Sequence, residues 1–259
     1  MPKSIMLKKG RQRAYFNEVW QSMLTHLLAF CETQKPEELH QFRVQVKKIK
    51  ALLFFLQGRS AVKQLKPLQA IFKQAGKIRS AHVNLAFIEQ YQVADAEIKN
   101  EQEKIAHSES QRFCSKVGTH VKTLKKLRKT LAAIFQDIEN KAVVRVCKKQ
   151  LKKLSRFFTR PDLPVVQLHH IRKKIKNLLY FCDVLPESLL QKFQLETAYL
   201  DQLQEAIGQW HDVVVAFELL KTEGITDKKL ERRRFSLFAS IRALAADFTK
   251  KSVLLPVHV

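Results

Sequence analysis

The sequence predicts an all-α protein. Glycine occurs 6 times and proline 7 times in 259 residues, so long stretches contain no helix-breaking residue. Leu, Lys, Gln, Glu and Ala, which favour helices, are abundant. Apolar residues recur at helical spacing, and a hydrophobic content of 46% is typical of a globular chain rather than a disordered one. A chain of this length can build one large domain or two small ones.

Apolar spacing and the positions of proline predict two successive sets of four helices. Pro36, Pro164 and Pro186 lie where helices are expected to begin or end. In the first half we expect helices near 8–31, 36–57, 61–91, and from 94 to 118 or beyond. In the second half we expect helices near 139–159, 165–184, 187–221 and 227–250. The segment 97–135 fits either one very long helix or two helices broken near Gly118.

Residues 39–50, with the sequence LHQFRVQVKKIK, combine two helical stripes that differ in character. At 100° per residue, the apolar stripe consists of Leu39, Phe42, Val46, Ile49 and Leu53. A cationic stripe beside it consists of His40, Arg43, Lys47 and Lys50. Because the apolar stripe must face a core, the cations border the buried seam rather than the opposite, solvated face. Cations held there repel one another and lose hydration unless an anion joins them.

The same pattern recurs in the second half of the chain. Residues 168–176, LHHIRKKIK, repeat the order of leucine, histidine, apolar residue, arginine, apolar residue and lysine seen at 39–47. Farther along each half, a lone glycine, Gly76 or Gly208, interrupts a helical pattern. Glycine within a helix costs about 1 kcal/mol relative to alanine, so its recurrence predicts close helix packing or a kink. The repeat predicts a duplicated domain with pseudo-two-fold symmetry.

These residues resemble the motif of the CHAD family, the conserved histidine α-helical domain, whose repeats carry H-x-x-R followed by further basic residues on a helix. The first copy matches at His40, Arg43, Val44, Lys47, Lys48, Ile49 and Lys50. The second copy matches at Leu168, His169, Arg172, Lys173, Lys176, Leu178 and Tyr180. Gly76–Arg79 and Gly208–Asp212 are similar to a later G-x-x-R-D-like element of the family. The resemblance covers nearly the whole chain.

The resemblance implies one domain over residues 1–259, with half-repeats at approximately 1–118 and 119–259. It implies two four-helix bundles around a basic channel that binds inorganic polyphosphate without catalysis. Asn177 and Leu179 stand where the family motif prefers basic residues. Ser80 replaces an expected aspartate in the first half, and His211 precedes the aspartate of the second. We therefore expect the second half to form the weaker anion contact.

The charge of the chain fits a polyanionic partner. Lys and Arg number 47 against 24 acidic residues, which gives a net charge of +23 and a pI near 10.0. Such a field attracts nucleic acid, polyphosphate, inositol phosphates or an anionic membrane. Arginine can grip phosphate oxygens with two donors, lysine supplies a mobile charge, and anions favour protonated histidine. The predicted polyphosphate-binding residues are His40, Arg43, Lys47, Lys48, Lys50, Arg79, Arg145, Lys149, Lys152, His169, Arg172, Lys173 and Lys176.

Three other functions stay open at this point. A chain of this charge binds DNA or RNA non-specifically at low salt, although it carries no helix-turn-helix, zinc or RNA-binding strand motif. His211–Asp212, with His169 upstream and Asp227 or Asp247 downstream, is reminiscent of metal phosphohydrolases. The chain could also be a helical adaptor that docks an acidic protein. We favour binding over catalysis and expect no metal or cofactor.

Cysteine usage and hydropathy bear on the cellular compartment. Cys31, Cys114, Cys147 and Cys182 are scattered among apolar residues, which predicts buried free thiols in a reducing cytosol. The longest apolar run, at 51–56, is far shorter than the roughly 20 residues of a membrane span. We expect a soluble cytoplasmic protein without a membrane partner, found where polyphosphate granules form.

Overall fold

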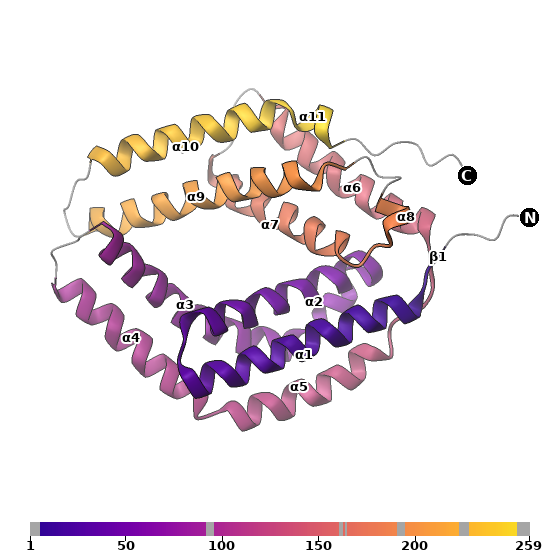
Figure 1. Cartoon of the computed structure of the whole chain (residues 1–259), viewed down its shortest axis with the longest axis horizontal. Helices are drawn as coiled ribbons and strands as arrows, with labels where there is room; N and C mark the ends of the chain where they lie inside the picture. The colour runs from indigo at the N-terminus through magenta and orange to yellow at the C-terminus, as the bar shows by residue number, and fades with distance from the viewer. Residues whose placement is uncertain are drawn as a thin grey trace, which may run out of the picture. The chain divides into compact units, whose positions relative to one another are not determined.

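The computed structural model describes residues 6–91, 96–160, 163, 165–190, 195–222 and 228–252, and nearly all of them are helical. This confirms the predicted all-α class (Figure 1). The chain divides into two compact units. The N-terminal unit consists of Lys8–Asp137, and the C-terminal unit consists of Met1–Leu7 together with Ile138–Val259.

The N-terminal unit is a bundle of helices that pack in sequence order. Its helices are α1 (Lys9–Thr33), α2 (Pro36–Lys63), α3 (Lys66–Gln90), α4 (Ala96–Cys114) and α5 (Val117–Ala132). Helix α1 packs on α2, α2 on α3, and α3 on α4, while α5 contacts both α1 and α3. Phe16, Trp20, Phe42 and Phe113 are fully buried and form the aromatic part of this core.

Two helix boundaries in this unit refine the predictions. The segment 97–135 forms two helices, and the break falls at residues 115–116, just before Gly118, which is itself helical. Helix α2 extends past the predicted end at residue 57, because a kink at Gly58 redirects it before it ends at Lys63. Gly58 has φ 76°, a left-handed conformation that glycine adopts without steric cost.

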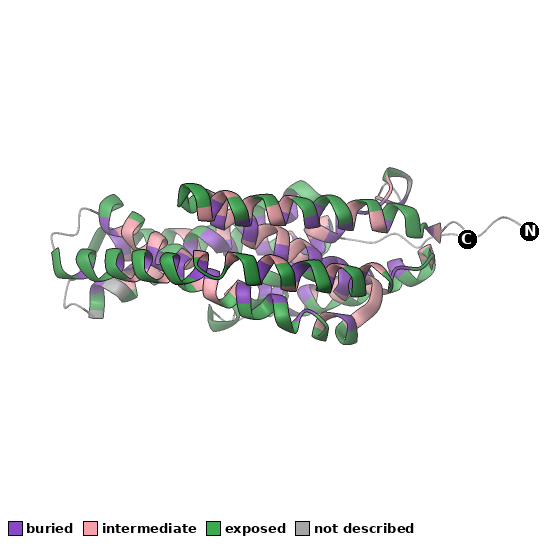
Figure 2. Cartoon of the chain, turned by 90° about the horizontal axis from the view of Figure 1, so that it is seen from below, coloured by how far each residue is buried: buried purple, intermediate pink, exposed green. Residues whose placement is uncertain are grey.

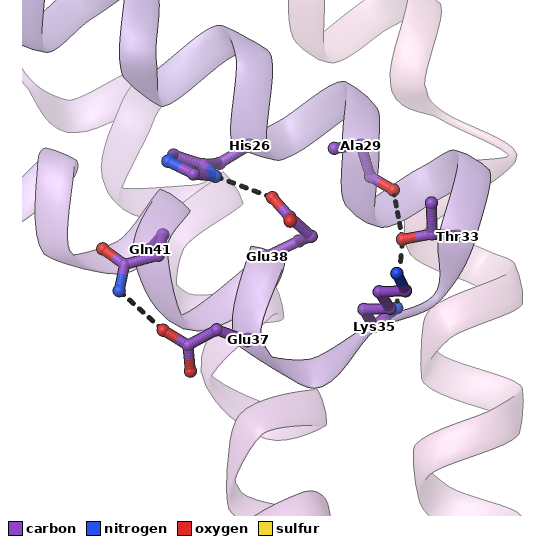
Figure 3. Close-up of polar contacts among 7 residues, drawn as sticks. All are labelled: His26, Ala29, Thr33, Lys35, Glu37, Glu38 and Gln41. Carbon is purple, nitrogen blue, oxygen red and sulfur yellow. Dashed lines mark hydrogen bonds and ion pairs between the residues drawn. The ribbon is translucent and has the colours of Figure 1, made fainter.

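The turn from α1 to α2 is held by several polar contacts (Figure 3). Gln34 ends α1 in the left-handed conformation, with φ 56°, and its N–H donates to the carbonyl of Phe30 at 2.8 Å. The hydroxyl of Thr33 donates to a carbonyl one turn earlier. Across the turn, His26 Nδ1 and Glu38 Oε2 lie 2.7 Å apart, both partly buried. These contacts fix the direction in which α2, the helix of the first H-x-x-R motif, leaves α1.

The C-terminal unit contains the second motif. Its elements are β1 (Met6–Leu7), β2 (Ile138–Glu139), α6 (Asn140–Phe158), α7 (Val165–Cys182), α8 (Glu187–Leu190), α9 (Thr197–Thr222), α10 (Lys228–Ala246) and α11 (Phe248–Lys251). The two short strands pair antiparallel, so a piece of the N-terminus belongs to this unit. Helix α7 packs on α6 and α9, and α9 packs on α10.

Burial follows the predicted stripes (Figure 2). On α2, the apolar stripe is buried at every position: Leu39, Phe42, Val46, Ile49 and Leu53. On α7, the equivalent stripe is buried as well: Leu168, Ile171, Ile175 and Leu178. Both helices therefore pack their apolar stripe against the core of their own unit. Within the described chain, no helix combines the length and the apolar character that crossing a membrane requires.

Candidate functional site

The cationic stripe of α2 lies at the edge of the buried seam, as the sequence predicts. His40, Arg43, Lys47 and Lys48 are partly buried, and Lys50 is exposed. The stripe thus runs from the semi-buried start of the helix toward solvent. A cation in such a position keeps its charged group within reach of a ligand while its aliphatic part packs against the protein.

Arg43 reaches across to α3, where Gly76 makes room for it. Its Nη1 donates to the carbonyl of Phe72 at 2.7 Å, and its guanidinium lies 4.1 Å from the centroid of the Phe72 ring. A Cβ atom on Gly76 would lie 2.8 Å from that Nη1, closer than real Cβ contacts allow. The lone glycine inside α3 therefore serves close packing rather than a kink, one of the two alternatives that its recurrence predicts.

The surroundings of Arg43 are cationic. Burial lowers the pKa of Arg43 to about 10, and the charge of Arg79 adds to this effect. Burial also lowers the pKa of His82, again with Arg79 contributing. Among the described residues, no carboxylate shifts the pKa of Arg43 in the opposite direction. The N-terminal unit therefore holds Arg43 partly desolvated beside a second cation.

Arg172 makes the corresponding contact in the C-terminal unit. Its Nε donates to the carbonyl of Gln204 on α9 at 3.0 Å. A Cβ atom on Gly208 would lie 2.5 Å from Nη2 and 2.8 Å from both Cζ and Nε of Arg172. In both units, then, the motif arginine donates to the carbonyl four residues before a helical glycine and packs over that glycine. We call this arrangement the arginine–glycine contact.

The electrostatic surroundings of Arg172 differ from those of Arg43. Burial and the charge of Arg172 lower the pKa of Lys176, whereas Glu205 and Asp201 act in the opposite direction. Burial raises the pKa of Tyr180 to about 12, and Asp201 contributes while Arg172 opposes. The Lys176 ammonium lies 6.0 Å from the centroid of the Tyr180 ring. Carboxylates on α9 therefore offset part of the positive charge on α7.

The second motif histidine stacks on another histidine. The rings of His169 on α7 and His211 on α9 have centroids 4.1 Å apart and an interplanar angle of 39°. Burial lowers the pKa of His211, the adjacent Asp212 raises it, and Arg172 and Lys173 lower it further. Neutral rings at this separation pack well, whereas two protonated rings would repel each other, so an anion is needed if both are to carry charge.

The ligand set of the metal phosphohydrolase alternative is not assembled in the described chain. Within those residues, no group of three His, Cys, Asp or Glu side chains is placed to hold a metal ion. Asp247 lies at the start of α11, where its carboxylate is 3.9 Å from the ammonium of Lys250. Asp227 lies outside the described residues.

The remaining predicted residues lie on exposed helix surface. Lys173 is exposed on α7, and Arg145, Lys149 and Lys152 are exposed on α6. Of these four, Lys173 acts on the neighbourhood of the arginine–glycine contact, because its charge lowers the pKa of His211. They stay predicted phosphate contacts that depend on the reach of long, solvated side chains.

Sequence reasoning missed three kinds of residue at these sites. His82 lies three residues after Arg79, which places it on the same face of α3, and that spacing could have identified it. Asp201 and Glu205 act on α7 from α9, and only knowledge of the helix pairing links them. The pKa of Lys174 is lowered by burial and by the charge of Lys153 on the neighbouring helix α6. This effect too depends on which helices pack together.

Comparison with known proteins places the chain in a family. The family model described as CHAD domain matches residues 14–221. The chain belongs to the CHAD family. It is also similar to the crystal structure of the CHAD domain from the plant Ricinus communis, with a TM-score of 0.66 and 18% sequence identity. That match covers 94% of this chain and 95% of the other. No curated protein matches the chain.

Family membership confirms the resemblance that the sequence motifs indicate. Both H-x-x-R segments and both helical glycines lie within the matched residues 14–221. At 18% identity, the similarity to the plant domain shows a shared fold. The arginine–glycine contacts of this chain are therefore part of a CHAD domain.

Proposed function

We propose that this CHAD domain binds inorganic polyphosphate, without catalysis, through the cationic stripes of α2 and α7. The observation that carries the proposal is the partial burial of the Arg43 guanidinium near a second cation. That cation is Arg79, and both burial and its charge lower the pKa of Arg43. A partly desolvated cation pair is costly in the free protein and becomes favourable when an anion arrives.

The arginine–glycine contact supports phosphate binding because it orients the guanidinium. Arginine has five N–H donors in a planar fork, and the contact with Phe72 uses Nη1 alone. The backbone thus holds Arg43 in place while Nε and Nη2 stay available for phosphate oxygens. An arginine that is already ordered loses less side-chain entropy on binding than a free one.

The spacing of the stripe favours a linear polyanion over a compact one. His40, Arg43, Lys47 and Lys50 follow one another along the axis of α2, over roughly 15 Å at 1.5 Å per residue. Polyphosphate carries about one charge per phosphate and offers no base to read, so charge-assisted contacts to its oxygens supply the affinity. The expectation that α2 and α7 wall one shared channel stays a prediction.

Calorimetric titration at physiological ionic strength tests the proposal. Long-chain polyphosphate and an RNA of equal charge are titrated into the native protein and into the Arg43→Ala/Arg172→Ala variant. We expect polyphosphate to bind more tightly than RNA. Loss of the two contacts, at about 1.4 kcal/mol for Arg43 and about 0.7 kcal/mol for Arg172, should weaken polyphosphate binding about 30-fold.

A matched control separates a site from a diffuse basic surface. The Lys125→Ala/Lys129→Ala variant removes the same charge from exposed positions on α5. We expect it to weaken binding by less than about threefold. Equal affinity for both polymers, with both double variants alike, would contradict the proposal. Non-specific nucleic-acid binding, favoured by the net charge of +23, would then be the better description.

A second assay tests the non-catalytic part of the proposal. Polyphosphate is incubated with the native protein in the presence of Mg²⁺, Mn²⁺ or Zn²⁺, and released phosphate is measured. We expect no release above that of the polymer alone. Metal-dependent release that is lost in a His211→Gln variant would instead support the phosphohydrolase alternative.

A further inference from the structure

The four cysteines form two neighbouring pairs, one in each unit, that differ in burial. Cys147 and Cys182 are neighbours in the C-terminal unit and are buried, with 2% and 6% of their surface exposed. Cys31 and Cys114 are neighbours in the N-terminal unit and are only partly buried. The sequence prediction of buried thiols is therefore right for the first pair and wrong for the second.

The partly buried pair joins two helix ends. Cys31 lies in the last turn of α1, and Cys114 is the final residue of α4. Their thiols are hydrogen-bonded to each other. The Gln34 amide donates to Cys114 Sγ at 3.4 Å and to the carbonyl of Cys31 at 3.5 Å. The Gln34 side chain thus links the sulfur of Cys114 to the backbone of Cys31.

We propose that Cys31 and Cys114 form a reversible disulfide when the protein meets a peroxide. The Cys114 thiolate attacks one peroxide oxygen, the O–O bond breaks, and hydroxide leaves, which gives a sulfenic acid. The Cys31 sulfur then attacks the Cys114 sulfur, the S–O bond breaks, and water leaves with the proton of the Cys31 thiol. Both sulfurs are oxidised together by two electrons, and the peroxide is reduced to two waters. A thiol reductant reverses the reaction by exchange.

The contacts assign the two roles. The Gln34 amide donates to the Cys114 sulfur. Burial and the hydrogen bond to Cys114 raise the pKa of Cys31, so Cys31 keeps its proton and serves as the resolving thiol. An order of attack with Cys114 first follows from these contacts.

The buried pair provides the contrast within the same molecule. Burial raises the pKa of Cys147, and it raises the pKa of Cys182 to about 12. The pKa of Cys31 is raised as well, so the contrast between the pairs is solvent exposure: thiols that lie away from solvent react slowly with peroxide. We therefore expect Cys147 and Cys182 to stay reduced under conditions that oxidise Cys31 and Cys114. Disulfides that form transiently in a reducing compartment are usually of such a redox-responsive kind.

A disulfide here would tie the end of α1 to the end of α4. Gln34 and the turn that leads into α2 lie directly beside it. Because the cross-link closes a long loop, from residue 31 to residue 114, it should stabilise the N-terminal unit. From loop-closure entropy, we expect oxidation to raise the unfolding midpoint by on the order of 10 °C.

Peptide mapping after mild oxidation tests the proposal. The reduced full-length protein is treated with a small excess of hydrogen peroxide, its remaining thiols are alkylated, and it is digested without reductant. We expect one cross-linked peptide pair that contains Cys31 and Cys114, a mass lower by two hydrogen atoms, and reversal by dithiothreitol. Alkylated Cys147 and Cys182 should appear only after denaturation.

Variants assign the steps. In Cys31→Ser, a sulfenic acid at Cys114 should persist long enough to be trapped by dimedone, whereas Cys114→Ser should yield much less adduct at Cys31. Cys147→Ser, the matched control, should form the Cys31–Cys114 cross-link at the native rate. Gln34→Gly keeps the left-handed turn and removes the amide, and it should slow oxidation several-fold.

Several outcomes would overturn the proposal. These are a cross-link between Cys147 and Cys182, a cross-link between two protein molecules, or over-oxidation of Cys114 without any cross-link. The readout is covalent and needs no polyanion, so it stands or falls independently of the polyphosphate proposal.

Discussion

The two units of this CHAD domain share one arginine contact but differ in the acidic residues near it. The two halves of the sequence can be aligned on the helical glycines Gly76 and Gly208. In this alignment, three acidic residues of α9 correspond to non-acidic residues of α3. Asp201, Glu205 and Asp212 correspond to Gln69, Lys73 and Ser80, and His211 corresponds to Arg79. The contact itself is the same in both: an arginine donates to a carbonyl across a glycine.

This difference separates what the fold needs from what a ligand needs. Both arginines order a helix pair by backbone hydrogen bonding, which does not depend on nearby acids. The positive charge that attracts a polyanion does depend on nearby acidic residues, because they neutralise part of it. Glu205 and Asp201 raise the pKa of Lys176, whereas the charge of Arg79 lowers the pKa of Arg43. We expect the N-terminal unit to contribute more of the anion affinity.

Substituting the glycines should disrupt the arginine–glycine contact without changing the arginine itself. In Gly76→Ala, the new methyl group meets a single terminal atom of Arg43, so the guanidinium can move away. Polyphosphate affinity should fall about tenfold, because the donors are no longer oriented. The free energy of unfolding should change by less than about 1 kcal/mol, since the helical gain of alanine offsets the lost hydrogen bond. Calorimetry and denaturant unfolding measure the two quantities.

Gly208→Ala is the matched variant in the other unit. Its methyl group would meet three atoms of the Arg172 guanidinium, including Nε, so the whole group must leave. Stability should therefore fall by about 1 kcal/mol more than in Gly76→Ala, while polyphosphate affinity should fall less. A smaller loss of stability, or a larger loss of polyphosphate affinity, in Gly208→Ala than in Gly76→Ala would contradict this comparison of the two contacts.

Exchanging one pair of corresponding residues should shift affinity in opposite directions. Glu205→Lys gives α9 the residue that α3 has, and Lys73→Glu does the converse. We expect polyphosphate binding to strengthen about fivefold in the first variant and to weaken about fivefold in the second, from about 1 kcal/mol of charge interaction each. Titrations at two salt concentrations check this, because the shifts should shrink as salt rises. Equal and small effects would mean that neither position faces the polymer.

Acid should favour binding through His211. Burial, Arg172 and Lys173 keep its pKa below the ordinary value of about 6.5, and Asp212 opposes them in part. The unfolded chain therefore takes up more protons, and the free protein loses stability as the pH falls below about 6.5. A bound polyanion raises the pKa, so affinity should rise about threefold in the same window.

The variant His211→Arg sharpens this test. It places at this position the residue found in the N-terminal unit, Arg79, which keeps its charge at neutral pH. Binding should become tighter near pH 7.5 and gain less on acidification, as titrations near pH 7.5 and 5.5 would reveal. An unchanged pH dependence would assign the effect to other histidines.

Local patterns explain how much of this could be predicted from the sequence. Stripe periodicity placed Leu39, Phe42 and Ile49 in the core and the cations beside them, because one helix determines its own faces. The repeat predicts close packing or a kink at Gly76 and Gly208 but not the arginines that pack there, since those lie on another helix. The neutralising role of Glu205 and the pairing of Cys31 with Cys114 likewise depend on contacts between segments far apart in the sequence.

The most direct test of the difference between the units compares Arg43→Ala with Arg172→Ala. Each variant removes one motif arginine and one charge, and polyphosphate affinity is measured by calorimetry for both under identical conditions. We predict a loss of about tenfold for Arg43→Ala and of about threefold for Arg172→Ala, because carboxylates already offset part of the charge near Arg172. Equal losses, or a larger loss for Arg172→Ala, would contradict the conclusion that the N-terminal unit holds the stronger anion site.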